Sequence, residues 1–355
     1  MAAMSMTPRQ RWLAIFQGKQ PDRIPTDFWS TSEVLSGLKR DLNCADDESL
    51  CRRLHIDRPR SLAPRCKLPH HPNDPQADLW GVRYQSINYG TGNYDEATYH
   101  PLANMTSASE IRAFRWPSPD DYDYSPITET LANDDGTRAI LACHFEPFLL
   151  YCSLRGMEQA YEDLLLSPEI ADAVLGQVFD FYNEFNRRIF QAGRGRIDLT
   201  YIAEDLGGQT GPLFSLATFR RFLLPNQKKM ADLARSFGIH IFYHTDGASR
   251  PFIADLIDIV GIEILNPIQW RCPGMEREGL VRDFGGRIAF HGAIDNQQTL
   301  PFGSSRDVAD QVKECARMFK GCRWICAPCH NIQPVTPTAN IVAMYETIHE
   351  IGALV

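Results

Sequence analysis

Short apolar runs alternate with amphipathic segments from about residue 139 to the end of the chain, and this alternation constrains the fold more than any other feature. The runs are rich in aliphatic and aromatic residues, and one more stands near the N-terminus. They occupy residues 23–29, 139–144, 197–205, 239–246, 262–269, 287–295 and 323–330. Apolar runs that alternate with helices are typical of parallel strands buried on both faces. The pattern therefore excludes a β-sandwich and a helical bundle.

Capping residues, prolines and glycines mark the helices between these runs. Thr7 and Pro8 open the first predicted helix and Gly18 closes it, because proline suits the first helical position and glycine follows the last. The same signals predict helices over 167–193, 215–238, 250–261, 305–321 and 336–352.

Two α/β architectures agree with this order, a doubly wound open sheet and a closed (β/α)8 TIM barrel. Neither a GxGxxG nor a GxxxxGK[ST] motif occurs, so nothing supports a nucleotide-binding open sheet. We therefore predict a single TIM-barrel domain over residues 1–355. Residues 44–121 are rich in Pro, His and Asp and contain a candidate hairpin at 79–89. We expect them to form an excursion over the barrel mouth.

The charge and hydropathy of the chain exclude several kinds of partner. A formal net charge of −8 argues against nucleic acid, which usually requires a basic surface. No run of about 18 apolar residues occurs, so we expect no membrane span. The first six residues lack the basic segment of a signal peptide, and we expect a cytoplasmic protein. There the ten cysteines would be buried thiols or metal ligands rather than disulfides.

Polar and aromatic residues follow nearly every predicted strand at its C-terminal end. In a barrel these ends meet at one mouth, where the active sites of this fold lie. The residues concerned are Phe28, Trp29, His144, Glu146, Glu204, Asp205, Gln209, His244, Asp246, Gln269, Trp270, His291, Asp295, Cys329 and His330. Their coincidence predicts an enzyme.

A metal site is the sharpest hypothesis among them. His244 and Asp246 stand two residues apart, so on a strand both side chains point the same way, and Gly247 allows the chain to turn. Cys329 could supply a third ligand from a neighbouring strand end. Three N, O and S ligands with an open position are typical of catalytic zinc. The alternative is that Cys326 and Cys329 form a redox pair.

Two further carboxylates are candidates for acid–base chemistry. Asp205, beside Glu204 and before two glycines, could bind a substrate hydroxyl or a metal, or act as a base. An exposed acidic loop is the alternative. Asp78 precedes Trp80-Gly81 and could place an acid under the excursion, or simply begin a turn.

Several short motifs, in order along nearly the whole chain, resemble the uroporphyrinogen decarboxylase superfamily, which includes the corrinoid-linked methyltransferases. The motifs are Pro21–Pro25, Asp78–Gly81, Leu154–Glu158, Glu204–Gln209, His244–Gly247, Leu265–Pro267, Gly292–Asp295 and Pro328–Pro334. The resemblance implies a (β/α)8 barrel.

The resemblance also bears on the reaction. Decarboxylases of this kind look arginine-dependent just after the first strand, but residues 28–33 contain no arginine to receive a carboxylate-rich substrate. Asp78 and His330 nevertheless match the decarboxylase's acid and histidine. The zinc methyltransferases carry a His-x-Cys pair and a distant Cys, which His244 and Cys329 match, whereas Asp246 replaces the first Cys.

A His, Asp and Cys donor set is harder than one with two thiolates and suits activation of a substrate oxygen. We therefore expect a zinc-dependent methyltransferase that moves a methyl group between a small methylated, methoxy compound and a corrinoid (cobalamin) on a partner protein. The expected metal ligands are His244, Asp246 and Cys329; the catalytic residues are Asp78, Asp205 and His330; the substrate-binding residues are Phe28, Trp29, His144, Glu146, Gln209 and Gln269. His330 could serve as a proton source for the leaving oxygen.

Three other functions stay open. They are transfer from the corrinoid to a thiol, decarboxylation of the uroporphyrinogen type, and a binding barrel without catalysis. The sequence leaves the oligomeric state open, a homodimer included.

Overall fold

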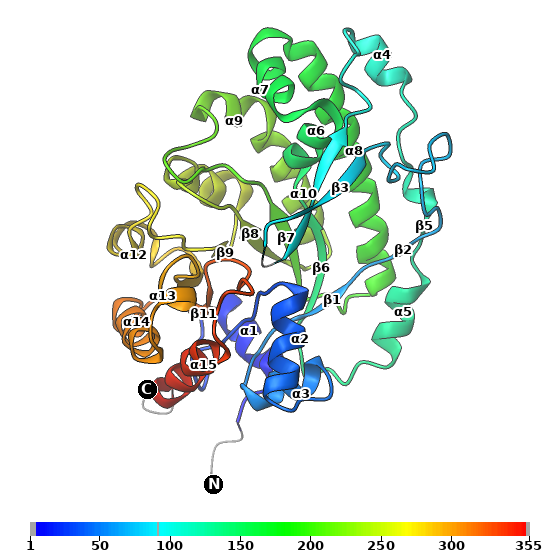
Figure 1. Ribbon diagram of the computed structural model, residues 1–355. Helices are drawn as coiled ribbons and strands as arrows, with labels where there is room; N and C mark the ends of the chain where they lie inside the picture. Colours follow the sequence, from blue (N-terminus) through cyan, green and yellow to red (C-terminus); the bar gives the residue numbers. More distant parts are fainter. Residues whose placement is uncertain (1–4, 91, 353–355) are drawn as a thin grey trace.

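A computed structural model describes residues 5–90 and 92–352 as an α/β fold around a curled parallel sheet of the TIM-barrel type (Figure 1). The sheet has seven strands in the order β1-β6-β7-β8-β9-β10-β11, and every neighbouring pair is parallel. The strands are β1 (Arg60–Leu62), β6 (Ile140–Phe145), β7 (Leu199–Ala203), β8 (His240–His244), β9 (Ile264–Asn266), β10 (Ala289–Ile294) and β11 (Trp324–Pro328). The six runs predicted from residue 139 onward are thereby confirmed as strands.

Helices and short turns of helix surround the sheet. The α-helices are α1 (Pro8–Phe16), α2 (Ser32–Asp41), α3 (Asp47–Arg53), α4 (Ala108–Ala113), α5 (Ser125–Ala132), α6 (Pro147–Arg155), α7 (Met157–Leu166), α8 (Pro168–Gly193), α9 (Leu216–Phe222), α10 (Leu224–Ser236), α11 (Ile253–Asp255), α12 (Arg277–Phe284), α13 (Thr299–Phe302), α14 (Ser305–Met318) and α15 (Thr338–Gly352). Shorter turns are the 3-10 helices η1 (Pro119–Asp121) and η2 (Arg250–Phe252) and the π-helix η3 (Leu256–Val260). None of the helices in the described ranges combines the length and the apolar character that a membrane crossing requires.

The helix boundaries follow the predicted caps closely. Thr7 accepts a hydrogen bond from the backbone of Gln10 in a capping box at the start of α1. The helix expected over 215–238 is divided into α9 and α10 at Leu223, because Pro225 lacks the N–H that a continuous helix needs. The segment expected as a helix over 250–261 is instead a succession of η2, α11 and η3.

Two expectations near the N-terminus differ from the structure. The run 23–29 forms no regular strand: Thr26 makes one isolated parallel bridge to Cys326, and Pro25 has no N–H to extend it. Asp57 donates its N–H to the carbonyl of Thr26 at 3.0 Å, so the segment lies between β11 and the approach to β1. Residues 60–62, which we had placed in the excursion, are a strand of the main sheet paired with β6.

The rest of the segment 44–121 contains two small antiparallel pairs. They are β2 (Arg65–Cys66) with β5 (Tyr122–Asp123), and β3 (Arg83–Asn88) with β4 (Asn93–Tyr99). The second pair confirms a hairpin close to the predicted one. Tyr89 at the end of β3 donates a hydrogen bond to Gln333 at 3.2 Å, so the hairpin touches the loop that follows β11.

Buried apolar residues form two clusters, one between the sheet and its helices and one enclosed by the sheet. In the enclosed cluster alternate residues of a strand point inward, as the two-residue period of a strand requires. It contains Trp12, Ile15, Phe16, Ala139, Leu199, Tyr201, Ala203, Phe242, Ile264, Ala289 and Ile325. The first three belong to α1, so this helix closes the interior at the end where the strands begin. We call that end the base, and the end where the strands finish the mouth.

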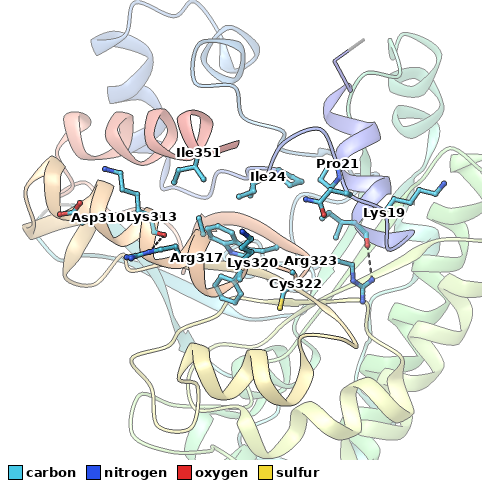
Figure 2. Close-up of a pocket in the computed structure, with 17 residues that line it drawn as sticks. Lys19, Pro21, Ile24, Asp310, Lys313, Arg317, Lys320, Cys322, Arg323 and Ile351 are labelled. Carbon is cyan, nitrogen blue, oxygen red and sulfur yellow. Dashed lines mark hydrogen bonds between the residues drawn. The ribbon is translucent and has the colours of Figure 1, made fainter. Parts of the chain in front are cut away.

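A cavity of about 630 Å³ lies at the base, where β11 begins (Figure 2). Its walls are largely apolar and include Ile15, Ile24, Phe319 and Trp324. Five cations surround these walls: Lys19, Lys313, Arg317, Lys320 and Arg323. None of the five forms an ion pair with any residue in 5–90 or 92–352. Among the described residues Asp310 is the one carboxylate in the wall, so the cavity carries more positive than negative groups.

Candidate metal and substrate site

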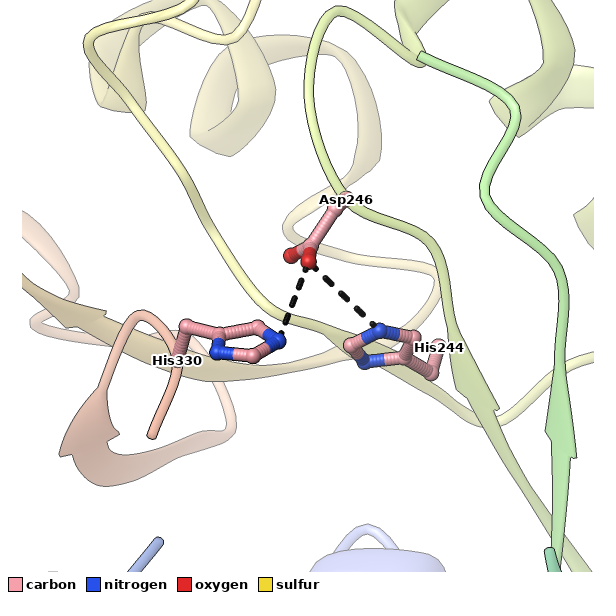
Figure 3. Close-up of side chains that lie close together, drawn as sticks. All are labelled: His244, Asp246 and His330. Atoms are coloured by element: carbon pink, nitrogen blue, oxygen red, sulfur yellow. Dashed lines mark ion pairs between the residues drawn. The ribbon is translucent and has the colours of Figure 1, made fainter. Parts of the chain in front are cut away.

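Three potential metal ligands come together at the mouth (Figure 3). His244 ends β8, Asp246 lies in the turn after it, and His330 follows β11. One donor atom from each lies within 4.8 Å of the other two. Asp246 Oδ2 is 3.8 Å from His244 Nε2 and 3.3 Å from His330 Nε2. Two imidazole nitrogens and one carboxylate oxygen thus face a common point.

Close backbone contact positions Asp246 beside a second carboxylate. Gly247 has φ +69°, and a Cβ there would lie 2.2 Å from the carbonyl oxygen of Gly207. A Cβ on Gly207 would in turn lie 2.4 Å from the backbone nitrogen of Ala248. Only glycine fits both positions, so the turn after β8 packs directly on the loop after β7. Asp246 consequently donates its N–H to Asp205 Oδ1 at 3.2 Å.

His244 is almost fully buried and held on several sides. Its Nδ1 lies 2.6 Å from Asn266 Oδ1. The ring of Trp29 stacks on it at 5.7 Å between centroids and an interplanar angle of 21°. Its Nε2 is therefore directed to the carboxylates, 3.8 Å from Asp246 and 3.7 Å from Asp205.

One oxygen of the cluster has no partner. Asp246 Oδ1 is buried and accepts no hydrogen bond from the described residues. A buried carboxylate oxygen is normally paired, because leaving it unsatisfied costs about 1–3 kcal/mol. A bound divalent cation would satisfy it. The donor set of two imidazoles and a carboxylate suits Zn²⁺ and also Fe²⁺, so these residues fit a metal ion.

The expected third ligand, Cys329, is not one of the three. Its backbone N–H still pairs with β10 through the carbonyl of Ile294, and its thiol donates to the carbonyl oxygen of Ile268 at 3.2 Å. Burial, and next Asp295, raises the pKa of this thiol well above its usual value, so the thiolate that binds metals is disfavoured. His330, one residue further, takes the place we had expected for Cys329. Cys326 and Cys329 are both free thiols rather than a disulfide.

Three acids near the cluster differ in how readily they ionise. Burial and the charge of Asp246 raise the pKa of Asp205. Burial opposes ionisation of Glu146, but a hydrogen bond from His144 and the proximity of His244 lower its pKa overall. Glu204 is buried and accepts the N–H of Phe148 at 3.0 Å, near the start of α6, and its pKa is raised by burial. Of the three, Glu146 is the acid whose surroundings favour the ionised form, and its negative charge favours a cation nearby.

An aromatic cavity of about 570 Å³ lies beside the three ligands. Phe28, Trp29 and His144, three of the predicted substrate-binding residues, line it. Tyr201 lines it too and lies 5.6 Å from the ring of His244, so Trp29 and Tyr201 join the cavity to the cluster. Arg58 is the single Lys or Arg in its wall, and it forms no ion pair with the residues that the structure describes.

The remaining predicted residues lie around these two features. Gln269 accepts the N–H of Gly247 at 2.8 Å and donates to Gln209 at 3.2 Å, so both amides brace the turn that carries Asp246. Glu146 lies 3.5 Å from His144 at the end of β6. Asp78 accepts hydrogen bonds from the N–H groups of Trp80 and Val82, both at 2.9 Å. It therefore begins a turn, which was the alternative to its role as an acid under the excursion.

Sequence reasoning missed three residues of the site. Tyr201 stands inside β7, and Asn266 ends β9 but lies before the end of the predicted run 262–269, so the search for strand-end residues passed over both. Arg58 precedes a strand too short to recognise. The motif Leu265–Pro267 contains Asn266 and could have identified this residue from the sequence.

Comparisons with known proteins agree on a family and a fold. The sequence pattern of the uroporphyrinogen decarboxylase (URO-D) family matches residues 103–351. The fold superimposes on a methyltransferase from Methanosarcina mazei with TM-score 0.67 and 19% identity, over 98% of this chain and 99% of that one. It also overlaps a B12-independent methionine synthase from Shewanella sp. W3-18-1, with TM-score 0.45 and 11% identity, over 94% and 95% of the two chains. No curated protein sequence matches the chain.

Proposed function

The chain belongs to the uroporphyrinogen decarboxylase family, and on that premise we propose that it is a zinc-dependent methyltransferase. It would move a methyl group from a small methoxy compound to a corrinoid carried by a partner protein. The observation that carries the proposal is the cluster of His244, Asp246 and His330, in which Oδ2 of Asp246 faces both histidines and Oδ1 is unpaired, next to an aromatic cavity. A methyltransferase that shares the fold over nearly its whole length supports the reaction class.

His244, Asp246 and His330 would hold the metal. Zinc would supply Lewis-acid polarisation of the substrate oxygen, and the corrinoid a low-valent cobalt that accepts the methyl group. Asp205 lies 3.7 Å from His244 Nε2 and accepts the N–H of Asp246 at 3.2 Å, so its carboxyl group lies beside the proposed metal. Burial, the largest cause, raises its pKa and favours the protonated acid. We assign it the role of delivering a proton to the oxygen that loses the methyl group.

The cavity selects the substrate. Trp29 and Tyr201 offer ring faces, which suit an aromatic compound, and Arg58 offers an unpaired guanidinium at the wall. These groups favour a methoxy-substituted aromatic carboxylate over an uncharged ether. The side chains that line the cavity also keep water from the methyl group during transfer.

Metal analysis together with a transfer assay tests the proposal. Protein purified without added metal should contain close to one zinc per chain, with iron measured in the same samples. Asp246→Asn and His330→Gln should lose it, whereas Asp78→Asn, which changes a turn carboxylate outside the cluster, should retain it. Reduced cobalamin should be methylated from methoxybenzoate faster than from methoxybenzene.

Other outcomes would redirect the assignment. Turnover by metal-free wild-type protein would overturn the zinc mechanism. Iron in place of zinc would change the metal while leaving the ligands. Methylation of a thiol from methylcobalamin, with no reaction of methoxy compounds, would favour the corrinoid-to-thiol alternative.

A further inference from the structure

Three inward-pointing polar side chains stand side by side on β8, β9 and β10, inside an otherwise apolar interior. The sheet register pairs His244 with Asn266, and the pairing of Phe290 with Leu265 puts His291 next to Asn266 on the other side. Asn266 Oδ1 lies 2.6 Å from His244 Nδ1, and Asn266 Nδ2 lies 2.6 Å from His291 Nδ1. His291 Nε2 lies 3.0 Å from Asp27 Oδ2. A continuous buried chain of hydrogen bonds therefore joins Asp27 to His244.

Asp27 gives this chain a direction. An ionised carboxylate can only accept, and Asp27 accepts from Phe28 N–H at 2.8 Å and from Trp29 Nε1 at 2.9 Å as well as from His291. Burial opposes its ionisation, but the bonds and charge of its partners, His291 foremost, lower its pKa overall. His291 must then carry its proton on Nε2, which leaves Nδ1 as an acceptor.

The direction passes through Asn266 to His244. The amide nitrogen of Asn266 donates to His291 Nδ1, so its oxygen is left to accept from His244. His244 must donate through Nδ1–H, and a neutral imidazole with its proton there has a lone pair on Nε2. Nε2 is the atom that faces Asp246 and Asp205.

We propose that Asp27, His291 and Asn266 are positioning residues that hold His244 in the Nδ1–H tautomer, so that its Nε2 is always ready to bind the metal. This inference rests on the proposed function for the identity of the metal, but the tautomer itself is a property of the metal-free chain. In the opposite direction the Asn266 amide would be reversed, so that its nitrogen donates to His244 Nδ1 and its oxygen accepts from His291 Nδ1. His291 would then need protons on both ring nitrogens, because its Nε2 still donates to Asp27. His244 would then carry its proton on Nε2, and its metal-binding face would be blocked.

The chain offers matched variants. Asp27→Asn is isosteric but can donate to His291 Nε2, which reverses the direction, so His244 should show a mixture of tautomers. Asn266→Ala removes the oxygen that accepts from His244 Nδ1–H. Asn266→Asp keeps an oxygen acceptor for His244 but loses the N–H group that donates to His291. Tyr243→Phe is the control, because it breaks a buried 2.9 Å hydrogen bond to Gln227 next to His244 but outside the chain.

Nitrogen-15 NMR of histidine-labelled, metal-free protein reads the tautomer directly. The His244 signals are identified by their loss in His244→Gln. Wild type, Tyr243→Phe and Asn266→Asp should show a protonated Nδ1 and an unprotonated Nε2. Asp27→Asn and Asn266→Ala should shift toward the Nε2–H form. An Nε2–H tautomer in wild type, or an unchanged tautomer in folded Asp27→Asn, overturns the proposal.

Titration with Zn²⁺ gives a second, independent readout. Loss of such orienting partners typically weakens metal binding by about 10–100-fold, and we expect this for Asp27→Asn and Asn266→Ala but not for Tyr243→Phe. Asn266→Asp should bind at least as tightly as wild type. If wild type has the Nδ1–H tautomer but binds no metal, the proposed function fails while the tautomer assignment stands. Equal affinity in Asp27→Asn and wild type would contradict the positioning role.

Discussion

The two ends of the barrel-type sheet differ in the charged groups that surround their cavities, although the same strands run between them. At the mouth, His244, Asp246 and His330 surround a point where a cation fits, and Asp205 lies 3.7 Å from His244. At the base, five cations without ion pairs in the described ranges surround an apolar cavity (Figure 2).

The two ends also differ in how completely their polar groups are satisfied. α1 fills the interior at the base with Trp12, Ile15 and Phe16, all buried. The mouth leaves a buried carboxylate oxygen of Asp246 unpaired. The base therefore contributes to the stability of the fold, while the mouth keeps an unfavourable arrangement that ligand binding relieves. Substitutions at the mouth should lower metal or substrate affinity more than substitutions near the base.

β8 has a positive-φ glycine before it at the base and another after it at the mouth, and these give the largest expected contrast. Gly247→Ala places a Cβ 2.2 Å from the carbonyl oxygen of Gly207 and separates the two loops that carry the carboxylates. We expect Zn²⁺ affinity to fall by at least about 100-fold and stability by about 3 kcal/mol.

Gly238→Ala is the control, because Gly238 has φ +73° but open space around the new Cβ. It should cost only the left-handed strain, about 1–2 kcal/mol, and leave metal binding unchanged. Chemical denaturation and metal titration measure both effects. Equal metal affinities in the two variants would contradict the importance of the loop contact.

His330 and Cys329 are neighbours after β11, and their replacement separates the two possible third ligands. His330→Ala should weaken Zn²⁺ binding by more than the roughly 10–100-fold that loss of an orienting partner costs, because it removes a proposed ligand 3.3 Å from Asp246. Cys329→Ala should change it by less than about 3-fold, since the buried thiol is bonded to Ile268. Calorimetric titration distinguishes them, and the reverse order would restore Cys329 as the ligand.

Trp29 should affect substrate binding more than stability. It is half-buried at the mouth, lines the aromatic cavity and stacks on His244. Trp29→Ala should raise KM for a methoxybenzoate by about 10-fold, because a stacked pair of aromatic rings is worth about 0.5–1.5 kcal/mol beyond its buried area. Trp29→Phe keeps a ring and should lose less. A drop in melting temperature without a change in KM would show that Trp29 is mainly structural.

A histidine near the base should make stability sensitive to acid. Burial, and next the charge of Arg23, lowers the pKa of His349 in α15 to about 4, below the ordinary value of 6.5. The unfolded chain therefore binds a proton first, so stability falls as pH decreases from 6.5 toward 4. After allowance for partial exposure, we expect about 1–2 kcal/mol to be lost. Denaturant titrations of His349→Gln, which removes this slope, and of wild type measure it.

The sequence predicted the later strands well and the first ones poorly, for a physical reason. β6 to β11 are largely buried and read as apolar runs, whereas β1 contains Arg60 and Ser61 and has only three residues. The segment at 23–29 pairs through one bridge, since Pro25 interrupts the ladder. Hydrophobic pattern therefore detects strands by burial and overlooks those that are short and held mainly by backbone bonds.

The candidate site was predicted in its location but not in its detail. Strand-end residues do meet at one mouth, and His244 and Asp246 lie together as their spacing implied. The choice between Cys329 and His330 depends on the backbone direction after β11 ends at Pro328, and no two-residue period applies there. Asn266 and Tyr201 act through neighbours on other strands, which a one-dimensional pattern does not contain.

The stacking of Trp29 on His244 has an optical consequence. Indole fluorescence responds to the charge and polarity of whatever lies within van der Waals contact, and here the contact partner is itself a proposed metal ligand. When His244 binds an ion, the field across the Trp29 ring changes. Emission from this one side chain, isolated as the difference between wild type and Trp29→Phe, would then report occupancy of the mouth in real time, without any added dye.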